Sequence, residues 1–318
     1  MQAIILENGQ YHLRKRDKPE CPDDNILIKV AFCGVNRADL YQKQGKYPLP
    51  ESGVPGMEVS GEVVAWGKNA KHFKKGQNVC ALMSEGAYAE YVSVPASLAF
   101  PIPDNVTLEQ AAALPEACFT AWISLVWQGK LKPNESVLIH GGASGIGIIA
   151  IQIAKTLGAR VFATAGSPDK CAQCEKVGAE KAINYKEEDF VQVVKANTLK
   201  GVDVIMDMVG GDYFERNLDA LKKDGRMSII AFIKGPKITA NVSAILLKHL
   251  TVMGSTLRSR PLSEKKQIAQ ELREKIWPQV EKGQITPVID KIFPLGEAEK
   301  ALTHMEQGLN IGKILIRV

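Results

Sequence analysis

A glycine-rich turn at residues 140–147, with the sequence HGGASGIG, directly follows the short apolar segment SVLI. In the pattern G-x-G-x-x-G, the first glycine makes a tight turn, the second lets the backbone approach a pyrophosphate, and the third lets a helix pack on a strand. Gly142 and Gly147 take the first and third places, and Ser144 takes the second. The turn alone is also compatible with an ordinary connection between a strand and a helix.

The turn opens a long series in which apolar, strand-like segments alternate with helical ones. The strand-like segments are SVLIH, ARVFATA, KAINY, VDVIMDMV, RMSIIAF and TVMGSTL. The expected helices between them cover residues 145–157, 168–177, 187–196, 212–221 and 242–249. Six strands with intervening helices predict an α/β fold with a doubly wound parallel sheet. Because the turn follows the first strand, we expect a Rossmann domain that binds a dinucleotide.

The junction after the second expected strand indicates which dinucleotide binds. An NAD site carries Asp or Glu at that strand end, about 20 residues after the turn, whereas this chain has GSPDK at residues 166–170. Asp169 falls in the first turn of the expected helix, where a carboxylate favours the helix dipole. Lys170 can form a charge-assisted hydrogen bond to a 2′-phosphate, and Tyr185 ends the neighbouring strand. The sequence predicts NADPH; the alternative for Lys170 is a solvated lysine.

The segments on either side of this series have a different pattern. Residues 1–117 contain short strand-like segments cut by Gly, Pro and Asn or Asp, which predicts an antiparallel, barrel-like arrangement. Residues 258–318 contain an expected long helix over 262–282 and a terminal strand, GKILIRV. A chain of 318 residues exceeds the usual size of one hydrophobic core. We expect one domain from residues 1–117 and 258–318, interrupted by a Rossmann domain at 118–257.

Composition and charge indicate which partners and which cellular location to expect for this protein. A net charge of +5 without a block of Lys or Arg does not favour nucleic acid as a partner. The longest apolar stretch, residues 146–154, is shorter than the roughly 20 residues that cross a bilayer, and the first residues do not resemble a secretory signal. We therefore expect no membrane association and a cytoplasmic location. The six cysteines are scattered, so we expect free thiols; Cys171 and Cys174 form a solitary pair with metal or redox spacing.

Taken together, these features resemble the medium-chain dehydrogenase/reductase superfamily and, within it, the zinc-free quinone oxidoreductases. The resemblance covers essentially the whole chain. Among these enzymes, the chain is most similar to the tumour-suppressor-induced quinone oxidoreductase subfamily and its bacterial relatives. The most specific motifs are NRADL (36–40), QGKYP (44–48), AALPE (112–116), INYKEEDF (183–190), LRSR (257–260) and NIGK (310–313). The resemblance implies a GroES-like catalytic domain, a Rossmann NADPH domain and an active site in the cleft between them.

The resemblance also implies cofactor contacts and an assembly. The implied contacts are Thr120, Gly142, Ser144, Gly145, Ile146, Gly147, Gly166, Ser167, Lys170, Tyr185, Phe232 and Asn310. Thr120 resembles a family residue near the nicotinamide. The family commonly forms homodimers, and the apolar last Rossmann strand, residues 251–257, is a sheet edge that needs cover.

Zinc-dependent members of the superfamily hold a catalytic metal with Cys, His and a third Cys or acid. A comparison of spacing places Asn36, Met57 and Glu116 at those positions. An amide, a thioether and a single carboxylate are a poor ligand set for Zn²⁺. We therefore expect no metal.

Without a metal, hydride removal from a saturated alcohol is hard, whereas an electron-poor acceptor needs only hydride delivery and hydrogen bonds to its oxygens. The absence of a metal therefore favours reduction of a quinone or an activated alkene, and the resemblance implies an NADPH-dependent quinone reductase. In related quinone reductases the positions of Asn36, Tyr41 and Tyr47 line the acceptor pocket, and each side chain can donate a hydrogen bond. The alternatives are that Tyr47 packs in a turn and that Tyr41 lies on a helix face.

Two other functions stay open. One is reduction of 2-alkenals or enones on the same scaffold. The other is a weakly catalytic NADPH-binding protein, such as a redox sensor, an RNA-element binder or a lens-type structural protein. Hydrolase and metalloprotease chemistry are excluded, because Ser144 lacks a G-x-S-x-G setting and the five histidines form no H-E-x-x-H pattern.

Overall fold

A computed structural model describes all 318 residues. The chain divides into two compact units, and each is described by itself. Unit 1 consists of Met1–Glu116 and Arg258–Val318, and unit 2 consists of Ala117–Leu257.

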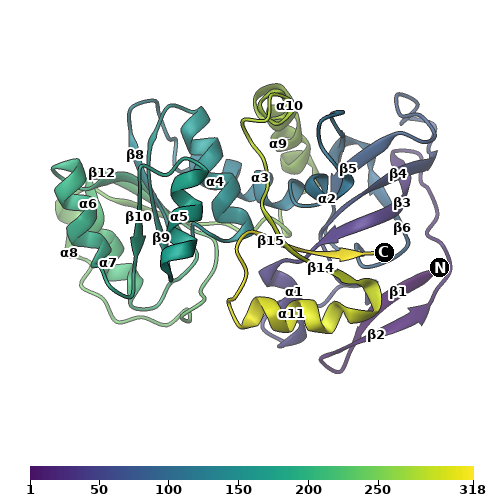
Figure 1. Cartoon of the computed structure of the whole chain (residues 1–318), viewed down its shortest axis with the longest axis horizontal. Coiled ribbons are helices and arrows are strands. Elements are labelled where there is room, and N and C mark those ends of the chain that lie inside the picture. Colours follow the sequence, from purple (N-terminus) through teal and green to yellow (C-terminus); the bar gives the residue numbers. More distant parts are fainter. The chain divides into compact units, whose positions relative to one another are not determined.

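Unit 2 contains a six-stranded sheet in which every pair of neighbouring strands is parallel (Figure 1). Its strands are β8 (Ser136–Ile139), β9 (Arg160–Ala165), β10 (Lys181–Asn184), β11 (Val202–Asp207), β12 (Leu221–Ile229) and β13 (Thr251–Gly254). The order β10-β9-β8-β11-β12-β13 is that of a doubly wound dinucleotide-binding fold. The predicted α/β class and Rossmann sheet are confirmed.

Helices connect these strands, and α4 and α5 lie beside the sheet on the side opposite α6 and α7 (Figure 1). The connecting helices are α4 (Gly145–Thr156), α5 (Pro168–Lys176), α6 (Phe190–Thr198), α7 (Tyr213–Ala220) and α8 (Ser243–Leu247). A further helix, α3 (Pro115–Trp122), spans the boundary of the units and continues as a π-helical segment, Ile123–Gln128. The sequence did not indicate that segment.

Unit 1 is built around a seven-stranded sheet with β14-β15-β3-β4-β5-β7 in order and β6 paired to β3. Its strands are β3 (Asn25–Gly34), β4 (Glu58–Trp66), β5 (Asn78–Leu82), β6 (Tyr91–Pro95), β7 (Ala99–Pro101), β14 (Ile289–Pro294) and β15 (Lys313–Arg317). All pairs except β14 with β15 are antiparallel, as the segments of residues 1–117 predicted. A separate hairpin joins β1 (Gln2–Glu7) to β2 (Gln10–Lys15) through Asn8 and Gly9, which both have positive φ.

The helices of unit 1 correct one prediction. They are α1 (Arg37–Lys43), α2 (Leu108–Ala111), α9 (Leu262–Lys275), α10 (Trp277–Glu281) and α11 (Ala298–Glu306), with single 3₁₀ turns at Ala96–Leu98 and Leu295–Glu297. The expected single helix over residues 262–282 is wrong, because it is divided at Ile276. Pro278 lies in the first turn of α10, where its missing N–H costs no intrahelical hydrogen bond.

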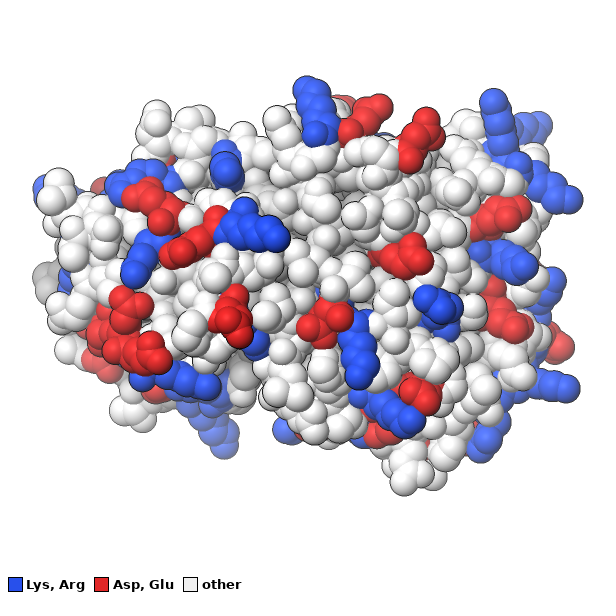
Figure 2. Space-filling view, viewed as in Figure 1, with Lys and Arg blue, Asp and Glu red and all other residues white.

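Positive and negative side chains are interspersed on the visible face, without a large patch of one sign (Figure 2). None of the helices has both the length and the apolar character that a bilayer crossing needs. None of the six cysteines forms a disulfide. Burial is the main cause that raises the pKa of Cys174, on α5, to about 12, so its reactive thiolate is scarce at neutral pH.

Candidate functional site

The glycine-rich turn of unit 2 connects β8 to α4. Gly141 has φ of 65°, and Ser144 is the N-cap of α4, where its Oγ accepts a hydrogen bond from the backbone N–H of Gly147 at 3.0 Å. A Cβ atom on Gly147 would lie 2.3 Å from the carbonyl oxygen of Gly141, so only glycine fits this approach of helix to turn. The first N–H groups of α4 thus open at the carboxyl edge of the sheet, as an anion site requires.

The second βα junction brings residues from two neighbouring strands together. Ser167 caps α5 through the N–H of Lys170, at 3.4 Å. The Tyr185 backbone N–H donates to the carbonyl oxygen of Ala165, and the Tyr185 hydroxyl lies so near this junction that a Cβ on Gly166 would be 2.5 Å from it. Tyr185 is 44% exposed. A serine, a lysine and an exposed phenol around a backbone without side-chain bulk fit a phosphate group.

The remaining predicted cofactor residues are more widely spread. Thr120 is buried on α3, and Phe232 follows β12 with half of its side chain exposed. Asn310 belongs to unit 1, where its Nδ2 donates to the carbonyl oxygen of Gly312 at 2.8 Å. Asn310 therefore does not belong to the unit that contains the two βα junctions, which we call the phosphate junctions.

In unit 1, the sheet order brings together polar residues that are far apart in sequence. β3 lies between β15 and β4, and Gly34 at its end pairs with Leu315 of β15. Asn36 lies two residues after that strand end, Glu58 is the first residue of β4, and Lys313 is the first residue of β15. These three side chains therefore meet at one edge of the sheet. We call them, with Asp39 and Glu116, the Lys313 cluster.

The ammonium group of Lys313 is the centre of this cluster. Its Nζ donates to Asn36 Oδ1 at 2.6 Å, and it forms ion pairs with Glu58 Oε1 at 2.6 Å and Glu116 Oε2 at 3.8 Å. The Lys313 side chain is 4% exposed and that of Glu58 is 0% exposed. Burial alone would lower the pKa of Lys313, but the two carboxylates outweigh it and hold that pKa above its ordinary value.

Hydrogen bonds inside the cluster occupy both amide protons of Asn36. Its Nδ2 donates to Gly34 at 3.3 Å and to Glu58 Oε1 at 3.1 Å, and only 4% of the residue is exposed. Glu58 passes so close to the backbone that a Cβ on Gly34 would lie 2.1 Å from its Oε1. The amide is thereby fixed in orientation. These bonds leave Asn36 without an amide proton for another acceptor in this arrangement.

Asp39 completes the cluster on the side of α1. It caps that helix by accepting from the backbone N–H of Asn36 at 2.8 Å, and it also accepts from the hydroxyl of the buried Tyr88 at 2.8 Å. Burial is the largest influence and raises the pKa of Asp39 to about 6, although both donors and Lys313 act in the opposite direction. Asp39 therefore changes between its protonated and ionised forms near neutral pH.

The cluster does not fit a zinc ion. Asn36 and Glu116 take two of the three positions that correspond to metal ligands by spacing, and in this structure they face a fixed ammonium group. No group of three or more His, Cys, Asp or Glu side chains in the chain is arranged to hold a metal. A cation is already supplied by the chain itself, and the amide is a weak ligand for zinc.

The two predicted tyrosines lie on and after α1. Tyr41 is half-buried within the helix, and Tyr47 is half-buried on the following loop. Burial is the main cause that raises the pKa of Tyr47; Glu116 acts in the same direction and Arg258 in the other. Tyr47 therefore lies within electrostatic range of the Lys313 cluster and keeps its proton at neutral pH.

Sequence reasoning did not identify Glu58 or Lys313 as site residues. Glu58 directly follows Met57, and Lys313 ends the motif NIGK and opens the apolar segment KILI. A lysine at the start of a buried strand needs a partner, and that signal was available. Its partner could not be named, because 255 positions separate Glu58 and Lys313 (313 − 58).

Comparison with known proteins adds independent observations. Residues 22–104 match the alcohol dehydrogenase GroES-like domain, and residues 145–274 match the zinc-binding dehydrogenase family. The chain is 34% identical to a quinone oxidoreductase of Mus musculus, covering 99% of this chain and 97% of that protein. It is 32% identical to the synaptic vesicle membrane protein VAT-1 homolog of Rattus norvegicus, covering 99% and 84%.

Among solved structures, the fold is similar to the quinone oxidoreductase of Escherichia coli complexed with NADPH. The TM-score is 0.88 at 29% identity, and the match covers 100% of this chain and 99% of that one.

Proposed function

The chain belongs to the medium-chain dehydrogenase/reductase superfamily of oxidoreductases, and we propose that it is an NADPH-dependent quinone reductase that works without a metal ion. The observation that carries the metal-free part is the Lys313 ammonium group between Asn36, Glu58 and Glu116. Similarity to a mouse quinone oxidoreductase supports the choice of acceptor.

Unit 2 supplies the cofactor site in this proposal. The N-terminus of α4, with Gly142, Ser144, Gly145, Ile146 and Gly147, receives the pyrophosphate. The junction of Gly166, Ser167, Lys170 and Tyr185 receives the 2′-phosphate, which distinguishes NADPH from NADH. When bound, NADPH supplies the hydride. Thr120, Phe232 and Asn310 stay predicted contacts of this cofactor.

Unit 1 supplies the acceptor site. We assign the phenol of Tyr47 as the donor to a quinone oxygen, since its raised pKa keeps the proton available. Tyr41 stays a predicted second donor. The amide protons of Asn36 are used inside the Lys313 cluster, so we assign Asn36 a positioning role between the cluster and the acceptor. An acceptor that gains hydride needs such donors and no Lewis acid.

A single assay separates the candidate functions. NADPH oxidation is measured with ortho-quinones, para-quinones, enals and enones, alongside elemental analysis for zinc and a chelator control. We expect quinones to be reduced fastest, no stoichiometric zinc and no effect of the chelator. Preference for enals or enones would favour the alkenal reductase, and tight NADPH binding without turnover would favour a weakly catalytic protein. One zinc per chain with inactivation by the chelator would contradict the metal-free mechanism.

We also propose a homodimer formed through unit 2. β13 is the last strand of its sheet and pairs only with β12, so one strand edge is open. The adjacent α8 exposes apolar side chains, with Leu246 at 77% and Leu247 at 73%. Light scattering tests the mass in solution, and a monomer at micromolar concentration would contradict the proposal. The cytoplasmic location stays a prediction, which cell fractionation tests.

A further inference from the structure

The loop that carries Tyr47 has little structure of its own. Neither helix nor strand is formed between the end of α1 at Lys43 and the start of β4 at Glu58. Leu49 at its tip is 60% exposed, so apolar packing contributes little there. Within the loop and α1, Gln42 Nε2 donates to the carbonyl oxygen of Pro48 at 3.0 Å. The Lys46 N–H also donates to the carbonyl oxygen of Tyr41 at 2.8 Å, and contacts with other segments hold the rest of the loop around Tyr47.

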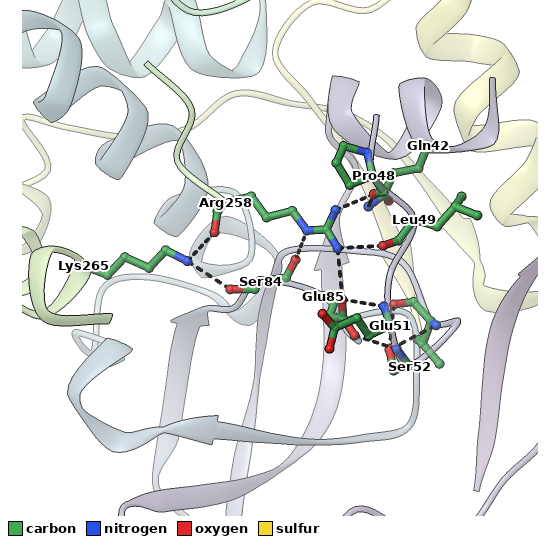
Figure 3. Close-up of polar contacts among 10 residues, drawn as sticks. Gln42, Pro48, Leu49, Glu51, Ser52, Ser84, Glu85, Arg258 and Lys265 are labelled. Atoms are coloured by element: carbon green, nitrogen blue, oxygen red, sulfur yellow. Dashed lines mark hydrogen bonds and ion pairs between the residues drawn. The ribbon is translucent and has the colours of Figure 1, made fainter. Parts of the chain in front are cut away.

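One arginine, Arg258, binds the loop backbone directly after Tyr47 (Figure 3). Arg258 donates to the carbonyl oxygen of Leu49 at 3.1 Å and also to that of Pro48. On its other side it donates through Nε to the carbonyl oxygen of Ser84 at 3.1 Å. Its guanidinium carbon lies 5.7 Å from the centroid of the Tyr47 ring, within the range of a cation–π contact.

Glu85 forms the other half of the attachment. Its Oε2 pairs with Arg258 at 3.0 Å, and the side chains are only 23% and 12% exposed. The same carboxylate accepts the loop's backbone N–H groups of Glu51 at 2.9 Å and Ser52 at 2.7 Å. Burial alone would raise the pKa of Glu85, but these N–H donors and Arg258 outweigh it and lower that pKa. Glu85 is therefore ionised and bound to the loop at neutral pH.

A buried lysine binds the backbone of Arg258. Lys265, on α9, is 5% exposed and donates to the carbonyl oxygen of Arg258 at 2.7 Å and to Ser84 Oγ at 3.0 Å (Figure 3). The backbone of Arg258 is thus tied to the segment that carries Glu85. Both ends of the arginine are held, so its guanidinium group has a defined place against the loop.

We propose that Arg258 is a positioning residue that, with Glu85, fixes the Tyr47 loop in the arrangement that receives the acceptor. This inference rests on the proposed function, because it assigns Tyr47 to the acceptor site. Arg258 acts on the acceptor through Tyr47 and does not itself contact the acceptor. The attachment therefore affects the rate at which the acceptor is reduced and leaves the affinity for NADPH unchanged.

The chemistry of the contacts requires arginine at this position. The guanidinium group uses separate N–H donors for Pro48, Leu49, Ser84 and Glu85 in one plane. A lysine keeps the charge but offers one compact ammonium group, which cannot reach acceptors on both sides. Arg258→Lys therefore separates the geometric role from the charge.

A double-mutant cycle with Tyr47→Phe tests the positioning role. We expect Arg258→Lys to lower kcat/KM for a quinone about 10-fold and to leave the KM for NADPH unchanged. In the Tyr47→Phe background, the same change should lower kcat/KM by less than about 2-fold, because the donor that it positions is already absent. Equal losses in both backgrounds would overturn the proposal. The matched control is Arg14→Lys, an arginine of unit 1 whose side chain is 54% exposed.

Hydrogen exchange tests the attachment without any acceptor. The backbone N–H groups of Glu51 and Ser52 should exchange faster in Arg258→Lys and in Glu85→Gln than in the wild type and Arg14→Lys, since their acceptor is loosened. Unchanged exchange would overturn the attachment. If the wild-type protein reduces no quinone while exchange responds as expected, the proposed function fails and the loop attachment stands.

Discussion

The Lys313 cluster of unit 1 and the phosphate junctions of unit 2 handle charge in opposite ways. In the cluster, a buried ammonium group is neutralised by buried carboxylates of the same chain. At the junctions, helix N-termini, Ser167 and Lys170 lie at an open edge beside the exposed Tyr185. The cluster is an ion network within the fold, whereas we propose that the junctions receive a charge from solution.

This difference predicts different consequences when each region is changed. Removing a charge from a buried pair leaves its partner uncompensated in a medium of low polarity, which destabilises the fold. Removing a charge from an open junction leaves water to solvate the remaining groups, so the fold is little affected and the ligand binds less tightly. Stability measurements should therefore respond to the cluster, and affinity measurements to the junctions.

The largest effect is expected for Lys313→Met, which keeps an unbranched side chain only one atom shorter and removes its charge. Because Glu58 would stay buried without its partner, we expect the free energy of unfolding to fall by about 3 to 5 kcal/mol. The control Lys300→Met removes an ammonium group that is 68% exposed, for which about 0 to 1 kcal/mol is expected. Urea unfolding measures both. A loss below about 1 kcal/mol for Lys313→Met would contradict the network.

The double variant Lys313→Met with Glu58→Gln makes the same comparison sharper. Neutralising both partners removes the uncompensated charge, so part of the lost stability should return. A double variant as unstable as the sum of the single changes would show that Lys313 and Glu58 do not act as a pair.

The pH dependence of stability tests Asp39, at the other end of the cluster. An unfolded Asp titrates near about pH 3.9, whereas Asp39 in the folded protein has a pKa of about 6. The folded state thus keeps the proton longer, so this contribution to stability is complete below about pH 4 and is lost as the pH rises through about 6. The two-unit difference corresponds to about 3 kcal/mol.

Asp39→Asn should remove this part of the pH dependence. Urea unfolding between pH 4 and 8 compares the variant with the wild type and with Asp17→Asn, an exposed carboxylate of the same unit. We expect the stability of Asp39→Asn, relative to the wild type, to increase as the pH rises from about 4 to about 7. A relative stability that is constant over this range would show that Asp39 does not take up its proton on folding.

The same contrast explains which parts of the fold could be predicted from sequence. In unit 2, the apolar strands alternate with helices, and the parallel topology follows from that order. In unit 1, the antiparallel strands were identified, but the division of residues 262–282 was not. The helical periodicity continues across Ile276, and Pro278 is compatible with the start of a helix as well as with its end.

The residues that we propose for the cofactor are easier to find in the sequence than those of the Lys313 cluster. The glycine-rich turn and the segment 166–170 are local, so their spacing alone indicates where the backbone can receive an anion. The Lys313 cluster depends on the order β15-β3-β4, which no local pattern specifies. Arg258 was visible only as part of a motif, because its acceptors are carbonyl oxygens of a distant loop.

An affinity effect is expected at the junction of unit 2. Lys170→Ala should weaken NADPH binding by roughly 10 to 150-fold, since a hydrogen bond to a charged group contributes about 1.5 to 3 kcal/mol. NADH binding and the free energy of unfolding should hardly change, in contrast to Lys313→Met. Titration of both cofactors measures this, with Lys176→Ala as the control because it removes an exposed lysine from the last turn of the same helix. Equal losses for NADH and NADPH would contradict the assignment.

The smallest effect is expected for Ser144, which belongs to the junctions but acts inside the fold. Its Oγ caps α4 through the N–H of Gly147, so Ser144→Ala should lower the free energy of unfolding by about 1 kcal/mol. Ser144→Gly should cost only a few tenths of a kcal/mol, roughly, since glycine is itself a good N-cap residue. That variant also completes the G-x-G-x-x-G pattern with Gly142 and Gly147, so NADPH affinity should be preserved. Urea unfolding of both variants decides the point: equal stability in Ser144→Ala and Ser144→Gly would mean that the hydroxyl does not cap the helix.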